Sequence, residues 1–195
     1  MYYVIRYGPA EDNSADLYMD PIPGKKVSFT RGERLGTLPL LTFRKRAGDR
    51  GAFLDYLGSS PPCMVVSDRF VEALRSVGVD NVDFYPAQLV DEATGKATPG
   101  YQAANVVGLI ACVDAAKSVY TLMPGLPEGG AIPKNGIFEF KSMHLDYTKV
   151  HGAKIFRLFE TTSTIIVHES VRDAIEKAGL RGIRLIPAEG LDAFY

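Results

Sequence analysis

The pattern of hydrophobic and polar positions occurs twice along the chain. The apolar positions of residues 64–88 (MVVSDRFVEALRSVGVDNVDFYPAQ) recur in residues 165–189 (IIVHESVRDAIEKAGLRGIRLIPAE), and the two segments align without a gap at an offset of 101 positions. Stacked repeat arrays need about three or more copies, so two copies with a long spacer exclude a solenoid. Five aligned pairs are identical: Val66 and Val167, Ala73 and Ala174, Gly78 and Gly179, Pro86 and Pro187, Ala87 and Ala188.

Each copy has the pattern of a strand, a helix and a second strand. An apolar run typical of a buried strand ends at Ser67, a good helix N-cap, or at His168 in the equivalent position. Apolar residues then recur at helical spacing up to Gly78 or Gly179, where a glycine can close the helix. The alternating residues that follow predict a half-buried strand. A unit of about 25 residues is short for a right-handed parallel crossover, so the sequence does not decide whether its two strands pair in parallel.

Strand patterns dominate the rest of the chain. Short apolar or alternating runs bounded by Gly and Pro are typical of strands. Residues 118–123 (SVYTLM) are the expected partner of the long apolar run in residues 101–114. The remaining expected strands are residues 1–7, 27–30, 38–43, 137–140 and 154–159.

These elements predict an α/β (α+β) fold with a mixed β-sheet, two strand–helix–strand repeat units and a β-rich middle segment. Residues 1–60 are expected to form an N-terminal lobe of strands and loops, either separate from or part of the same domain as residues 61–195. The second region holds both copies of the repeat. A chain of 195 residues is long enough to bury a sizeable core without disulfides or metals.

Composition narrows the class of protein. Hydrophobic residues make up 46% and charged residues 23%, with a net charge of −1, which is ordinary for a globular protein and argues against a main task of gripping nucleic acid or anionic lipid. Two cysteines, Cys63 and Cys112, are too few for a secreted disulfide scaffold. No apolar run reaches the length of a membrane span, and the first residues lack a signal-peptide pattern. We therefore expect a cytoplasmic protein.

A search for catalytic, cofactor or metal chemistry finds no convincing constellation. The glycine-rich residues 126–136 lack the Walker spacing, and no helix pattern follows them. His144 and His151 are seven positions apart and flank Asp146, without the spacing of a metal site. Both cysteines read as core or strand-end residues. The sequence therefore predicts no catalytic residue, no cofactor and no metal, and it lowers the expectation of an enzyme.

Charge is distributed unevenly near the N-terminus. Residues 1–24 carry one basic and four acidic side chains, whereas residues 25–50 carry eight basic and two acidic side chains. A solvated face is the simpler explanation of this pattern. A charged surface that meets a protein partner is the other explanation, because complementary charge speeds association. The candidate partner-binding residues are Glu11, Asp12, Asp16, Arg44, Lys45 and Arg46.

The repeat also carries a resemblance to a known family. The stretch KIFRLFETTSTIIVHESVRDAIEKAGLRGIRLIPAE resembles a recurring pattern in bacterial immunity proteins, and VVSDRFVEALRSVGVDNVDFYP is similar to the first unit of the same pattern. Segments around Asn105, Cys112 and Lys117 resemble it as well. The family is the polymorphic-toxin immunity family defined around an uncharacterised myxobacterial protein. The resemblance spans roughly residues 60–190.

This resemblance implies a cytoplasmic, non-enzymatic protein that binds and neutralises a cognate bacterial toxin domain. An acidic loop with Glu11, Asp12 and Asp16 could then mimic phosphate toward a nuclease toxin. Two alternatives stay open. One is a small-molecule or nucleotide-binding module, or an enzyme, with a pocket between the two repeat units; a deep pocket lined by His144, His151 and Asp146 would favour it. The other is a structural component of a larger secretion or phage-like assembly.

Overall fold

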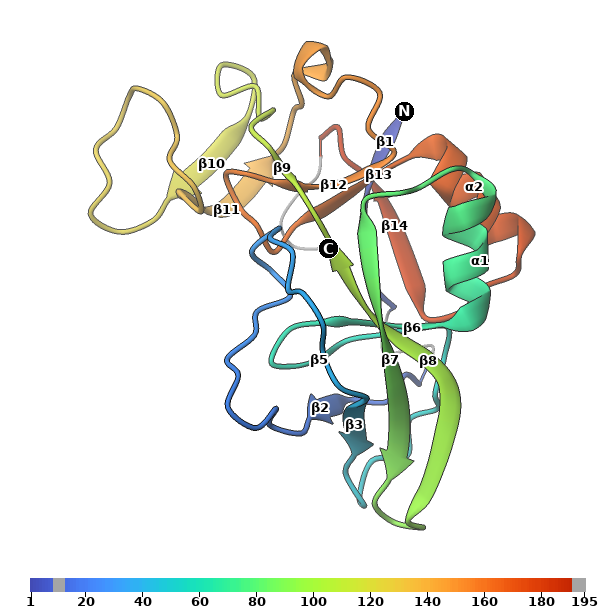
Figure 1. Cartoon of the computed structure of the whole chain (residues 1–195). Helices are drawn as coiled ribbons and strands as arrows, with labels where there is room; N and C mark the ends of the chain where they lie inside the picture. Colours follow the sequence, from blue (N-terminus) through green and yellow to red (C-terminus); the bar gives the residue numbers. More distant parts are fainter. Residues whose placement is uncertain (9–12, 191–195) are drawn as a thin grey trace.

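A computed structural model describes residues 1–8 and 13–190, which form two β-sheets, a two-stranded ribbon and two α-helices (Figure 1). Each helix has nine residues, and within the described chain no helix is both long and apolar enough to cross a membrane. The elements follow in the order β1 (Tyr2–Tyr7), β2 (Leu17–Met19), β3 (Leu41–Lys45), β4 (Tyr56–Leu57), β5 (Ser59–Ser60), β6 (Met64–Ser67), α1 (Asp68–Ser76), β7 (Val82–Asp91), β8 (Lys96–Val106), β9 (Leu109–Ile110), β10 (Val119–Leu122), β11 (Ile137–Ser142), the 3₁₀ helix η2 (Tyr147–Lys149), β12 (Ile155–Leu158), β13 (Ile165–His168), α2 (Glu169–Lys177) and β14 (Ile183–Pro187).

Both repeat segments fold as the strand–helix–strand units that their patterns predict, β6–α1–β7 and β13–α2–β14. Ser67 caps α1 by accepting a hydrogen bond from the backbone N–H of Phe70, and the Nδ1 atom of His168 caps α2 by accepting from the N–H of Ser170. Gly78 (φ 72°) and the equivalent Gly179 end the helices in the left-handed conformation, which glycine adopts without strain. Mixed sheets and two helices confirm the predicted α+β class.

A third strand separates the two strands of each unit. β8 pairs antiparallel with both β6 and β7, and β1 pairs antiparallel with both β13 and β14. The strands of each unit are therefore parallel to one another but not adjacent, which explains why a short helix can connect them. The registers agree: Ala104 lies opposite Met64 and Phe84, and Ile5 lies opposite Ile165 and Leu185 at the same offset of 101. The N-terminal strand thus completes the second unit.

The two units belong to different sheets. The five-stranded sheet has the order β14-β1-β13-β12-β9, and the seven-stranded sheet has the order β4-β6-β8-β7-β3-β2-β5. The two edge strands of the larger sheet, β4 and β5, are separated in sequence by Gly58 alone, so this sheet curls into a nearly closed barrel. A Cβ at Gly58 would lie 2.9 Å from the ring of Tyr7, so glycine permits this close approach.

Some expected strands differ from the structure. Residues 118–123 do not pair with the apolar run before them; β10 pairs with β11 and forms a separate ribbon. Residues 27–30 form no strand, because a turn interrupts the run, and the strand expected at residues 38–43 begins at Leu41. Within residues 1–60, β1 lies in the five-stranded sheet and β2 to β5 lie in the barrel. The division of the chain at residue 60 stays a prediction.

Three apolar clusters fill the molecule. The central cluster joins both units, since Phe70 and Leu74 of α1 pack with Val171 and Ile175 of α2 between the two sheets. Figure 1 shows the two helices side by side. A second cluster lies under the β-rich middle segment on the other face of the five-stranded sheet, and a third fills the barrel. The two halves therefore share one core.

Asp55 fastens the two halves at the start of α1. Its Oδ1 accepts from Ser67 Oγ at 2.7 Å and its Oδ2 accepts from the backbone N–H of Arg181, in the second unit, at 3.0 Å. Arg69 of α1 reaches across as well and donates to the carbonyl oxygen of Ala178. The side chain of Asp55 is buried, so these donors replace the water it loses on folding.

We expect Asp55→Asn to lower the free energy of unfolding by about 1–3 kcal/mol, because an amide offers one acceptor oxygen and leaves a buried donor unsatisfied. Urea unfolding followed by circular dichroism measures the loss. Asp80→Asn is the matched control, since Asp80 is exposed, and it should change stability by less than about 0.5 kcal/mol. Equal stability of the two variants would contradict the role given to Asp55.

Candidate functional site

The two halves enclose a cavity of about 260 Å³. β1 and the β12–β13 hairpin of the five-stranded sheet form one wall, and the segment from β4 to β6 of the barrel forms the other. Tyr56 and Arg157, which occupy equivalent positions of the two units, face it together. Burial raises the pKa of Tyr56, so its hydroxyl stays neutral. A cavity thus lies where the alternative interpretation of the sequence placed one.

Arg157 is the most unusual residue of this cavity, because it carries a charge but is only 2% exposed. It is held by three backbone carbonyls from three parts of the chain. Its Nε donates to the carbonyl oxygen of Val106 at 3.3 Å, its Nη1 to that of Thr162 at 2.8 Å and its Nη2 to that of Phe29 at 2.6 Å. Burial lowers its pKa to about 10, so the guanidinium remains charged at neutral pH.

The cavity continues at both ends into further hollows of the surface. Tyr7, Gly58 and Ser59 form part of its wall and also part of a second hollow that contains Asp16 and Arg46. Arg6, Ser163 and Thr164 are shared with a third hollow beside Phe138 of β11. The three hollows therefore form one face, which we call the cleft face and define by Asp16, Arg46, Tyr7, Arg6, Arg157 and Phe138.

The charged residues singled out in the sequence lie in different surroundings. Asp16 and Arg46 line the same hollow of the cleft face, where Arg46 lies over the ring of Tyr18. Arg44 is paired with Asp20 at 2.8 Å. Lys45 is 13% exposed and is paired with Asp91 at 2.8 Å. Glu11 and Asp12 lie outside the described residues.

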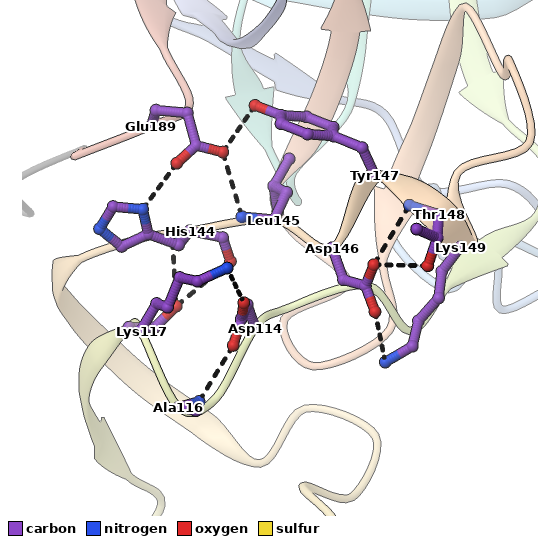
Figure 2. A network of polar contacts seen from close by, with 11 residues as sticks. Asp114, Ala116, Lys117, His144, Leu145, Asp146, Tyr147, Thr148, Lys149 and Glu189 are labelled. Atoms are coloured by element: carbon purple, nitrogen blue, oxygen red, sulfur yellow. Dashed lines mark hydrogen bonds and ion pairs between the residues drawn. The ribbon is translucent and has the colours of Figure 1, made fainter.

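The histidines considered as ligands lie elsewhere, in the β-rich middle segment (Figure 2). Asp146 caps η2 by accepting from the N–H and hydroxyl of Thr148, and it pairs with Lys149. His144 donates or accepts at 2.6 Å from Glu189, at the end of the chain's second repeat. His151 sits in an exposed turn with φ 49°. The walls of the cavity between the halves include none of these three residues.

Glu189 organises this segment, since its carboxylate bridges two neighbouring residues of the chain. Its Oε1 accepts from the hydroxyl of Tyr147 at 2.6 Å and from the N–H of Leu145 at 3.3 Å. Burial alone would raise the pKa of Glu189, but the hydrogen bonds from Tyr147, Leu145 and His144 outweigh it and lower the pKa. The ring of Tyr147 also stacks on Tyr2 of β1. The network therefore fastens the middle segment to the five-stranded sheet.

Exposed apolar side chains gather on the ribbon. Phe138 is 67% exposed, and Val119 and Met123 are also exposed. Figure 1 shows the ribbon and the loop between its strands projecting from the body of the molecule. In the described chain β10 pairs only with β11, which leaves its outer edge open. An exposed aromatic side chain on an open strand is typical of a surface that meets another protein.

Nucleophilic or metal chemistry finds little support at these places. Burial raises the pKa of both thiols, that of Cys112 to about 12, so neither is a ready nucleophile. Both cysteines are free and buried, as their sequence context predicts. Among the described residues no group of three His, Cys, Asp or Glu side chains could hold a metal ion.

Sequence reasoning missed the central residues of the cleft face. Arg157 was considered only as part of a strand, although a charged residue between apolar ones in a strand expected to be buried was a signal that it carries a special role. The repeat offset pairs it with Tyr56, and this was a second signal. No sequence pattern indicated that Phe138 would be exposed, because the pairing of its ribbon was assigned wrongly.

Comparison with known families supplies an independent finding. Residues 7–190 match the profile of an immunity protein family (Imm11), which covers nearly the whole chain and both halves of the fold. Among curated proteins none matches the chain in sequence. The matched region includes both repeat units, the ribbon and most of the cleft face. The chain therefore belongs to the Imm11 family of immunity proteins.

Proposed function

We propose that this protein neutralises a cognate bacterial toxin domain by binding it directly, in the cytoplasm and without catalysis. The match of residues 7–190 to an immunity family carries the proposal. The absence of a metal cluster among the described residues and the high pKa of both thiols support binding over turnover. The proposal includes no membrane contact and no direct contact with nucleic acid.

We place the toxin on the cleft face. Two exposed aromatic residues, Tyr7 (59% exposed) and Phe138, stand at either side of the cavity, and Arg6 and Arg46 lie beside them. Aromatic and arginine side chains are the residue types that most often anchor a protein interface. A standard interface buries about 800 Å² on each partner, which a face spanning three hollows can provide.

The charged residues near the N-terminus belong to the same proposal with different weights. Asp16 and Arg46 lie in the hollow next to Tyr7 and are placed to meet charges of the toxin. Arg44 and Lys45 are already paired within the chain, so they have less charge to offer. Glu11 and Asp12 are retained as candidate contacts because they adjoin this hollow in sequence. Such charges mainly raise the rate of association.

Neutralisation by binding predicts a stoichiometric effect. A tagged chain captures its partner from the cells that carry it, and the partner's toxic domain is then expressed alone to confirm that it arrests growth. Co-expression of this protein should restore growth, and the purified pair should form a complex of fixed ratio in light scattering. Inhibition should stop increasing once the two proteins are equimolar.

An enzyme that inactivates the toxin would behave differently in the same assay. It would neutralise a large molar excess of toxin over time and leave a covalently altered toxin in mass spectrometry. Either result would overturn the binding proposal. A captured protein that does not arrest growth would also overturn it, since an immunity protein's partner must be toxic.

The position of the interface predicts which variants lose affinity. Phe138→Ser should weaken toxin binding by about 30-fold or more, as truncation of an aromatic anchor costs about 2 kcal/mol. Leu40→Ser is the matched control, because Leu40 is similarly exposed but lies away from the three hollows, and it should change affinity less than about two-fold. Surface plasmon resonance with the identified toxin domain measures both.

The charged hollow has a kinetic signature of its own. Arg46→Glu should slow association more than it speeds dissociation, and the effect should shrink as salt is raised. Unchanged association rates at low salt would remove Arg46 from the interface. If Phe138→Ser and Leu40→Ser behave alike, the toxin binds a different face.

A further inference from the structure

The cavity between the two halves contains a buried positive charge without a counter-ion. Arg157 makes three hydrogen bonds, all to neutral carbonyl oxygens, and it forms no ion pair with a carboxylate in residues 1–8 and 13–190. A guanidinium has five N–H groups, so two remain after these three bonds. Burying an unpaired charge costs several kcal/mol, which carbonyl dipoles offset only in part.

The described residues around the cavity add to this positive character. Arg6 stands at its rim, and Thr30, Ser59, Ser163 and Thr164 bring hydroxyl groups to its walls. No Asp or Glu is among the described lining residues. A volume of about 260 Å³ admits a compact group and not a long chain. The cavity therefore has the charge, the donors and the size of a site for a small anion.

We propose that the cavity is a binding site for a carboxylate group, with Arg157 as its main ligand and Arg6 as a second one at the rim. One buried positive charge is neutralised by one negative charge, which a carboxylate supplies and a phosphate dianion exceeds. The planar guanidinium matches the geometry of a carboxylate, which accepts two parallel N–H bonds. The apolar part of the wall, from Ile5, Met64 and Ile165, suits the carbon atoms attached to such a group.

Two sources can bring this carboxylate. It is an acidic side chain of the bound toxin, in which case the site lies at the centre of the proposed interface, or it is a small free carboxylic acid. The binding chemistry is the same for both, and it is tested on the purified chain alone. Its outcome is therefore independent of whether the chain neutralises a toxin.

The first test is a titration of the isotopically labelled protein with sodium acetate, followed by NMR at constant ionic strength. The amide signals of Ile5, Met64 and Ile165 and the side-chain signal of Arg157 should shift and saturate with a Kd of about 1–10 mM, as expected for so small a ligand. Acetamide, which has the same shape without the charge, should cause no saturable shift. Inorganic phosphate should bind more weakly than acetate.

Variants decide whether the arginines carry the binding. Arg157→Met should abolish saturable acetate shifts, and Arg6→Gln should weaken binding several-fold. Arg50→Gln is the matched control, since Arg50 is exposed and does not line the cavity, and it should bind acetate like the unaltered protein. Should Arg157→Met fail to fold, Arg6→Gln remains decisive because Arg6 is exposed. An absence of saturable shifts, or equal binding by Arg6→Gln and Arg50→Gln, would overturn the site.

The toxin complex separates the two sources. If the toxin supplies the carboxylate, acetate binding disappears in the complex, and Arg6→Gln weakens toxin affinity as well as acetate affinity. If a free acid is the ligand, the complex still binds acetate, and Arg6→Gln leaves toxin affinity unchanged. Acetate binding by the isolated protein supports the site in both cases.

Discussion

The structure depends on the way its two strand–helix–strand units are held against each other. Their helices share one apolar core, and polar contacts at both ends fix the angle between the sheets. At one end Asp55 accepts from Ser67 and from the N–H of Arg181. At the other end Arg157 of the second unit reaches carbonyl oxygens of the first half. The cavity exists because these contacts hold the sheets apart where no side chain fills the space between them.

This arrangement explains why chain order and spatial order differ. The second unit lacks a strand of its own to place between β13 and β14, and the N-terminal strand β1 fills that position from the far end of the sequence. A deletion of residues 1–50 would remove β1, β2 and β3 from the two sheets. It would therefore unfold the scaffold and could not reveal what Asp16 or Arg46 does. Point substitutions on the surface are the appropriate way to examine these residues.

The sequence was sufficient for the local features and insufficient for those that depend on distant contacts. The caps at Ser67 and His168 and the closing glycines could be predicted, because each lies next to the helix it ends. The partner of β10 could not, because two strands of similar pattern compete for it and only tertiary packing decides. The three hollows join residues that are up to about 150 positions apart, so no local pattern could reveal the cleft face.

A buried charge in a binding face serves selectivity more than strength. A partner with a matching carboxylate gains a charge-assisted hydrogen bond, whereas a partner with an apolar or basic group at that point leaves Arg157 unpaired or repelled, and the second penalty is the larger one. Exposed aromatic residues such as Phe138 favour many partners alike, because apolar contact is not directional. On the cleft face the aromatic residues would then supply affinity, and Arg157 would restrict it to a toxin that carries an acid in the right place.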